Sequence, residues 1–124
     1  MIRRFAATIA VLATALGMAV VMNAPHAAAD SRKGCSYPYV CFYLKKSDWN
    51  NNHPTAMFQD MGYWQTLGSN SKGAYGVVNT RNDDTALIVH ASGYQSCAGP
   101  NGSLSGTDPD PYVKIKIIDT AWCP

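Results

Sequence analysis

The chain of 124 residues contains no glutamate, so all eight of its acidic side chains are aspartates. It therefore lacks the carboxylate that most often serves general acid–base catalysis. Histidine is also scarce, because only His53 and His90 follow the first 30 residues. The motifs G-x-S-x-G and H-E-x-x-H are absent too. We therefore do not expect an enzyme, and a small secreted hydrolase that uses both histidines is only the third hypothesis.

Long apolar runs are equally rare, and the single one lies near the N-terminus at residues 5–22. Arg3 and Arg4 precede it, and a polar break and an alanine triplet at 27–29 follow it. This order predicts a secretory signal peptide over residues 1–29 and one domain over residues 30–124. An uncleaved membrane anchor is the alternative, because the run approaches the length of a spanning helix. The alanine triplet and the absence of basic residues directly after it favour cleavage and a secreted protein.

Excess charge of one sign is also missing from the predicted mature chain. Loss of Arg3 and Arg4 would leave as many basic as acidic side chains. This balance argues against a polybasic surface for nucleic acid or membrane. We expect a monomer whose partner is a protein.

Four cysteines are present, and all lie in the predicted mature chain: Cys35, Cys41, Cys97 and Cys123. An even number in a small exported chain predicts two disulfides. Of the three connectivities we favour Cys35–Cys41 with Cys97–Cys123, because the first two are close in sequence. Neither pair has the short spacing of zinc ligands, so a metal site is the weaker interpretation.

Strand-forming runs separated by turns fill the rest of the chain. We expect strands at 39–44, 55–58, 74–80, 86–91 and 112–118, the last with alternating apolar and lysine residues. The asparagine run 50–52 predicts a tight turn, and the composition of 98–111 predicts a loop. No window shows helical periodicity. The fold class is therefore all-β, a small two-sheet Greek-key sandwich, with Phe42, Phe58 and Trp122 expected in its core.

A weak internal similarity links residues 40–51 with residues 87–96. Each segment holds a strand, a short polar stretch, an aromatic residue and a polar end. This similarity alone does not establish a repeat.

The stretch GCSYPYVCFY at 34–43 resembles the opening of small secreted actinobacterial proteins of the Streptomyces metalloproteinase inhibitor type. The resemblance implies a single βγ-crystallin-like domain and inhibition of a proteinase. Tyr43, Trp49 and Asn51 would take the places of the aromatic, aromatic and glycine residues of the crystallin Greek-key signature. Asn51 would then have to adopt the left-handed backbone that glycine provides.

The same resemblance implies that calcium is the one cofactor to consider. The nearest match to a crystallin calcium motif is the stretch 79–84, with Asn79, Asn82, Asp83 and Asp84 as candidate ligands. The alternative, which we favour, is a charged turn in which Arg81 pairs with Asp83 or Asp84. Asp108 and Asp110 are expected to stiffen their loop rather than to bind metal. For His90, in an apolar strand, we expect a structural hydrogen-bonded role.

Aromatic residues are more numerous than a small core needs, which indicates a contact surface. The candidate contact residues are Tyr37, Tyr63, Trp64, Tyr75, Tyr94, Ser103 and Leu104. Partial burial of the aromatic rings is the alternative. The favoured function is proteinase inhibition through the stretch 98–111 or the turn 50–53. A structural or cell-surface crystallin-type module, with or without calcium, is the second hypothesis.

Overall fold

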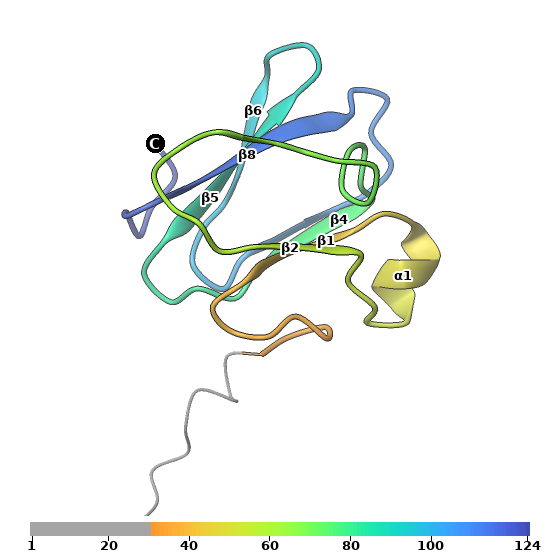
Figure 1. Cartoon of the computed structure of the whole chain (residues 1–124), viewed down its shortest axis with the longest axis horizontal. Helices are drawn as coiled ribbons and strands as arrows, with labels where there is room; N and C mark the ends of the chain where they lie inside the picture. Colours follow the sequence, from red (N-terminus) through yellow and green to blue (C-terminus); the bar gives the residue numbers. More distant parts are fainter. Residues whose placement is uncertain (1–30) are drawn as a thin grey trace, which may run out of the picture.

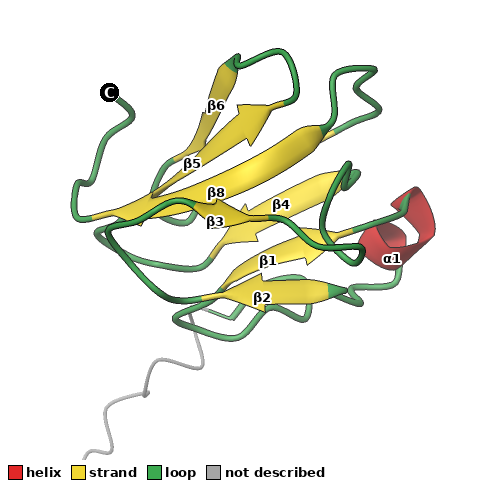
Figure 2. Cartoon of the chain, turned by 45° about the horizontal axis from the view of Figure 1, so that its top comes forward, coloured by secondary structure: helices red, strands yellow, loops and turns green. Residues whose placement is uncertain are grey.

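The computed structural model describes residues 31–124, so the predicted signal peptide lies outside the described residues. Two four-stranded antiparallel sheets pack face to face (Figures 1 and 2). In spatial order, sheet 1 contains β2 (Ala56–Phe58), β1 (Val40–Tyr43), β4 (Gly76–Asn79) and β7 (Ser103–Ser105). Sheet 2 contains β3 (Gln65–Thr66), β8 (Tyr112–Ile118), β5 (Thr85–His90) and β6 (Gln95–Ala98). The predicted all-β sandwich is confirmed.

The chain traces the same path twice, first through β1–β4 and then through β5–β8. In each unit the first strand pairs with the second and the fourth, while the third strand joins the opposite sheet. The second unit repeats this pattern, because β5 pairs with β6 and β8 while β7 joins β4. Each unit has the neighbour order of a Greek key. The exchanged third strands tie the two sheets together.

The main core lies between the sheets and is built from the alternate residues of each strand. Val40 and Phe42 of β1 face Ile88 of β5 and Ile115 and Ile117 of β8 in one buried cluster. Strand alternation explains this choice, because every second side chain of a strand points to the same face. Phe42 is fully buried, and Phe58 packs against the cluster from the edge. Those two predictions are confirmed, but Trp122 is 70% exposed and its predicted core position is wrong.

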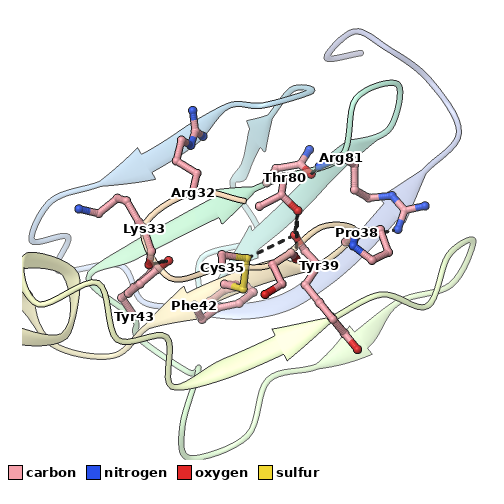
Figure 3. The surroundings of a disulfide bond; sticks show 12 residues. Arg32, Lys33, Cys35, Pro38, Tyr39, Phe42, Tyr43, Thr80 and Arg81 are labelled. Atoms are coloured by element: carbon pink, nitrogen blue, oxygen red, sulfur yellow. Dashed lines mark hydrogen bonds between the residues drawn. A yellow bond between two sulfur atoms is a disulfide. The ribbon is translucent and has the colours of Figure 1, made fainter. Parts of the chain in front are cut away.

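A second buried cluster covers the outer face of sheet 1. It contains Cys35, Cys41, Tyr43 and Val78, with Tyr39 and Trp49 packed against them. The N-terminal segment 31–39 crosses this face and is joined to β1 by the Cys35–Cys41 disulfide (Figure 3). The Tyr43 hydroxyl donates a hydrogen bond to the Lys33 carbonyl at 2.6 Å. The first strand is thus buried on both faces.

Both disulfides have the predicted connectivity, Cys35–Cys41 and Cys97–Cys123. The second bond joins edge strand β6 to the C-terminal segment beyond β8. Two disulfides in a domain of this size fit an extracellular protein. Within residues 31–124, no helix combines the length and apolar character that a membrane crossing requires.

Several local predictions were wrong. The stretch 98–111 is not a continuous loop, because it contains β7, and the short polar strands β3 and β6 were not expected. A short helix, α1 (Lys46–Asn50), follows β1 where only a turn was expected. The left-handed residue after it is Asn52, with φ of 53°, whereas Asn51 has φ of −90°. Asn51 therefore does not take the glycine-like conformation that the resemblance implied.

Candidate binding site at the α1 end

Four connections meet at the end of the sandwich where β1 runs into α1, which we call the α1 end (Figure 2). They are the segment 44–55 with α1, the segment 67–75, the β5–β6 turn at 91–94 and the loop 106–111. Strand pairing explains the convergence, because Tyr43 lies opposite Gly76, Gly76 opposite Ser105, and His90 opposite Tyr112. Two segments were predicted to bind a partner, the turn 50–53 and the stretch 98–111. The turn lies wholly at this end of the sandwich, and the stretch lies there in part.

Local hydrogen bonds fix α1 at both of its ends. The Asp48 carboxylate accepts a hydrogen bond from the Lys45 backbone N–H at 2.9 Å, which satisfies a donor at the helix start. At the other end, Asn52 adopts its left-handed conformation and the His53 N–H donates to the Asp48 carbonyl at 2.9 Å. The predicted turn at the asparagine run is therefore the end of a helix.

Trp49 anchors α1 to sheet 1. Its ring makes edge contacts with Tyr43 and Tyr75, at centroid distances of 5.2 and 6.3 Å. The Lys33 ammonium lies 4.4 Å from the centroid of the Trp49 ring. The ring fits because Gly76 lies beneath it, where a Cβ atom would come within 2.2 Å of the indole.

The loop 106–111 is exposed, yet hydrogen bonds hold it from both sides. Its Gly106 N–H donates to the Tyr75 carbonyl at 2.9 Å, and its Pro111 carbonyl accepts from Ala91 at 2.8 Å. The Asp110 carboxylate accepts from the Ser92 N–H at 2.9 Å and from the Ser92 hydroxyl. The hydrogen bond from the Ser92 side chain holds the pKa of Asp110 below its usual value.

The tip of the loop is stiffened internally as well. The Asp110 N–H donates to a carboxylate oxygen of Asp108 at 2.8 Å. Pro109 and Pro111 restrict the backbone further, since proline fixes φ. This confirms the expectation that the two aspartates stiffen the loop. The Asp108 side chain is still 48% exposed and can meet a partner.

A pocket of about 240 Å³ separates this loop from the start of α1. It is lined by Leu44, Lys45, Lys46, Gly73, Ala74, Tyr75, Gly106, Thr107 and Asp108. Two lysines therefore face the pocket from the α1 side and one aspartate from the loop. Of these residues only Tyr75 was a predicted contact residue, because the pocket arises between segments that are far apart in the sequence.

His90 lies beneath the same loop with only 3% of its surface exposed. Its Nδ1 is 2.8 Å from the Asp110 carbonyl oxygen, and its Nε2 is 2.6 Å from the Ser96 hydroxyl. The expected hydrogen bonding of His90 is confirmed. Sequence reasoning missed Ser96, whose contact with His90 depends on the β5–β6 hairpin.

The other predicted contact residues do not form one patch with Tyr75. Tyr94 is 66% exposed in the hairpin at the α1 end. At the opposite end, Tyr37 lies in the N-terminal segment, while Tyr63 and Trp64 precede β3 and Trp64 lies 5.8 Å from the Lys116 ammonium. The remaining two, Ser103 and Leu104, lie in edge strand β7.

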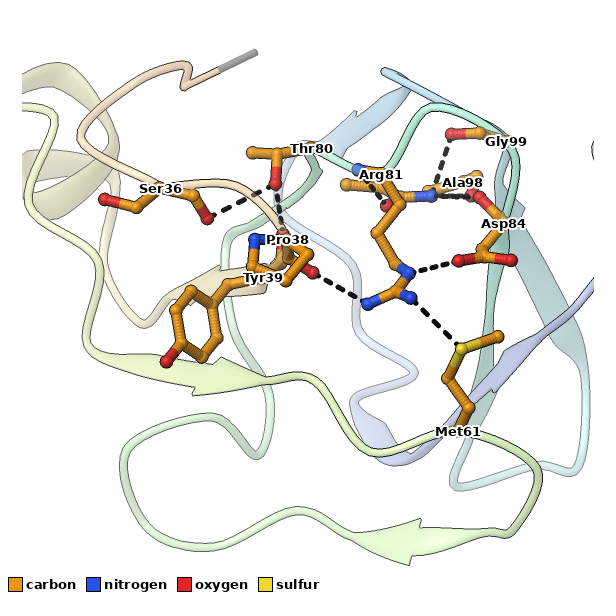
Figure 4. A network of polar contacts seen from close by, with 10 residues as sticks. Ser36, Pro38, Tyr39, Met61, Thr80, Arg81, Asp84, Ala98 and Gly99 are labelled. Carbon is orange, nitrogen blue, oxygen red and sulfur yellow. Dashed lines mark hydrogen bonds and ion pairs between the residues drawn. The ribbon is translucent and has the colours of Figure 1, made fainter. Parts of the chain in front are cut away.

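The stretch 79–84, which holds the candidate calcium residues, contains an ion pair between Arg81 and Asp84 (Figure 4). The Arg81 guanidinium pairs with Asp84 at 2.5 Å and donates to the Pro38 carbonyl at 3.0 Å. The Asn79 amide is buried and directed at the carbonyls of Asp84, Ala98 and Gly99, at 2.9 to 3.0 Å. The favoured interpretation, a charged turn with an Arg81–Asp84 pair, is confirmed.

The remaining two calcium candidates, Asn82 and Asp83, are exposed. The Asn82 side-chain oxygen accepts a hydrogen bond from Asn101 at 3.1 Å. Within the described part of the chain, no three or more His, Cys, Asp or Glu side chains are grouped as metal ligands. Calcium binding at this turn stays a prediction.

Comparison of the chain with protein-family models, with curated proteins and with solved structures finds no significant match.

Proposed function

We propose that the protein is a secreted binding protein that inhibits a proteinase through the α1 end. The observation that carries this proposal is the loop 106–111, which is exposed at its tip but hydrogen-bonded to Tyr75, Ala91 and Ser92 at its base. A loop held in its bound shape loses little conformational entropy on binding. The same bonds would keep the loop from adapting to a proteinase as a flexible substrate does.

The pocket beside the loop also supports the α1 end as the binding surface. Lys45 and Lys46 on one side and Asp108 on the other offer charges of both signs to a partner that sits on the loop tip. Charges at the rim of an interface contribute mainly to specificity and association rate. The partner class is therefore a protein with a polar cleft, as proteinases have.

The βγ-crystallin-like assignment is part of this proposal. It is supported by two Greek-key units that exchange their third strands between the sheets. The contact of Tyr43 with Trp49 supports it as well, because these residues occupy the two aromatic places of the signature. Export of the mature chain from residue 30 completes the proposal and accounts for both disulfides.

The test is to incubate the purified protein with a panel of secreted metallo- and serine proteinases and to measure residual proteinase activity. We expect at least one proteinase to be inhibited while the protein stays intact. Asp110→Ala removes the acceptor of both Ser92 bonds and should weaken inhibition about tenfold, with new cleavage inside 106–111. Ser36→Ala, an exposed position at the opposite end, is the control. Failure to inhibit any proteinase, or cleavage of the wild-type loop, would overturn the proposal.

A further inference from the structure

The imidazole of His90 lies between Ser96 and the loop 106–111, with one ring nitrogen directed at each. Its Nδ1 faces the Asp110 carbonyl oxygen at 2.8 Å, and a carbonyl oxygen can only accept a hydrogen bond. Nδ1 therefore carries a hydrogen, and in the neutral imidazole Nε2 is left as an acceptor. To this neutral ring the Ser96 hydroxyl, 2.6 Å from Nε2, donates its hydrogen. This is the arrangement in which a histidine can take a proton from serine.

Two carboxylates and two aromatic rings surround the imidazole of His90. Carboxylate oxygens of Asp108 and Asp110 lie 3.7 and 3.9 Å from Nδ1. An opposite charge at this distance stabilises the imidazolium that forms when Nε2 takes a proton. Tyr94 and Tyr112 hold the ring in place, with centroids 5.2 and 4.8 Å from that of His90. His90 is thus buried, oriented and flanked by acids that its structural role does not need.

Ser96 is partly exposed and belongs to the edge strand β6. His90 donates its backbone N–H to the Tyr94 carbonyl, and Ser96 lies opposite Ile88. Hydrogen-bonded pairs alternate along an antiparallel ladder, so the N–H groups of Gln95 and Cys97 point away from β5 toward the open edge. The N–H of the residue after a nucleophilic serine is a common donor to a reacting oxyanion.

We propose that Ser96 is a nucleophile that His90 activates toward carboxylic esters with a good leaving group. The Ser96 oxygen attacks the ester carbonyl carbon and its proton moves to Nε2 of His90. The carbon–oxygen bond to the leaving group then breaks, and the leaving alkoxide receives that proton. Water repeats the sequence on the acyl-serine and releases the acid. Ser96 and His90 are the catalytic residues. Asp110 is a positioning residue, because its backbone carbonyl fixes the tautomer of His90.

This activity is independent of proteinase inhibition, although both use the neighbourhood of loop 106–111. The direct probe is a fluorophosphonate, which reacts with serines activated by histidine and displaces fluoride. We expect one adduct in the intact mass, mapped to Ser96 by peptide sequencing. Ser96→Ala should lose the adduct, whereas Ser36→Ala, which removes an exposed serine far from His90, should keep it. An unlabelled wild-type protein, or an adduct elsewhere, would overturn the proposal.

The role of His90 requires a separate comparison. His90→Gln keeps a polar side chain but no base, and it should slow labelling of Ser96 at least about 100-fold. Should this variant not fold, the wild-type protein unfolded in urea with its disulfides intact replaces it, because unfolding separates Ser96 from His90. Labelling of Ser96 at an unchanged rate in either comparison would show that His90 does not activate it. Turnover is measured separately, as release of nitrophenol from p-nitrophenyl acetate by the wild-type protein. This release should be lost in Ser96→Ala.

Discussion

The two sheets share one core but differ on their outer faces. The outer face of sheet 1 is covered by the segment 31–39 and α1, and it buries the Cys35–Cys41 bond together with Tyr43. The outer face of sheet 2 instead carries Lys116 opposite Leu87, with Leu87 in turn opposite Cys97. Cys97 is partly exposed and Cys123 is exposed. One disulfide is thus part of a second core, and the other fastens a chain end.

This difference shows that two regions with the same strand topology can be stabilised by different interactions. On the outer face of sheet 1 the buried residues outside the main core are apolar and aromatic, so packing holds the covering segment 31–39 down. In the second unit, hydrogen bonds of His90 with Ser96 and with the loop 106–111 hold the α1 end together. We therefore expect the cover of sheet 1 to respond to changes in side-chain volume, and the second unit to respond to loss of hydrogen-bond partners.

Removal of each disulfide gives the largest expected effect and the sharpest test of this contrast. Loop closure alone predicts about 2.4 kcal/mol for Cys35–Cys41 and about 3.6 kcal/mol for Cys97–Cys123, because the second closes the longer loop. Replacement of both cysteines by serine also buries two hydroxyls in the first case, at about 1–3 kcal/mol each. Cys35→Ser with Cys41→Ser should therefore cost about 5 kcal/mol. This loss would exceed that of the Cys97–Cys123 bond, the opposite of what loop closure alone predicts.

Urea unfolding of both double variants, followed by circular dichroism under non-reducing conditions, measures these free energies. Cys35→Ala with Cys41→Ala is the matched control, because alanine brings no hydroxyl and should recover part of the loss. A larger loss for the Cys97 and Cys123 variant would mean that chain entropy outweighs burial, and that the outer cluster of sheet 1 contributes little.

Most of the fold could be predicted from the sequence where hydrophobic patterning is strong. β8 was predicted with its observed bounds, because its lysines alternate with buried isoleucines. The missed strands β6 and β7 are short edge strands with polar side chains, and their pairing comes from the neighbouring strand rather than from their own pattern. Trp122 was misplaced because a hydrophobic residue next to a cysteine gives no information on which side of a sheet the chain ends.

The candidate site was harder to predict for a different reason. Asp110 and Ser92 are 18 residues apart, and their contact depends on the register that places β5 beside β8. Lys45 and Thr107 meet at one pocket only after α1 has formed. Composition indicated a stiff loop at 98–111, but only the folded chain shows what holds it.

Gly76→Ala is expected to have the second largest effect, about 2–3 kcal/mol, and it probes the packed side of the comparison. The new methyl group would come within 2.2 Å of the Trp49 indole, so the ring must leave its place over sheet 1. Thermal unfolding and the near-ultraviolet circular dichroism of the tryptophan report the loss. Gly68→Ala, where nothing lies within 4 Å of the added carbon, should change stability by less than about 0.5 kcal/mol.

A rescue variant makes the cause specific. Trp49→Leu combined with Gly76→Ala removes the collision, so the double variant should be more stable than the sum of the two single losses predicts. Additive losses would show that the glycine acts through its backbone rather than through the space that Trp49 occupies.

The smallest expected effect is a loss of stability at alkaline pH, and it concerns Tyr43 on the outer face of sheet 1. Burial raises the pKa of Tyr43 to about 12, against a modest opposing influence of Arg32. In the unfolded chain the phenol ionises near pH 10. Because the folded-state pKa is the higher one, the fold favours the neutral phenol. This contribution is complete below about pH 10 and is lost as the pH rises through 12.

Tyr43→Phe should therefore cost about 1 kcal/mol at neutral pH, through loss of the bond to Lys33. Near pH 12 the sign should reverse, because ionisation of the phenol in the unfolded wild type removes more stability than this bond supplies. Urea unfolding of both proteins at pH 8 and pH 11.5 measures the difference in free energy of unfolding, which should change sign between the two pH values. Tyr112, whose pKa burial also raises, is present in both proteins and cancels. Tyr94→Phe, at an exposed position, is the matched control and should show no such change. A pH-independent difference for Tyr43→Phe would mean that ionisation of Tyr43 does not open the cover of sheet 1, and that its hydroxyl reaches water without unfolding.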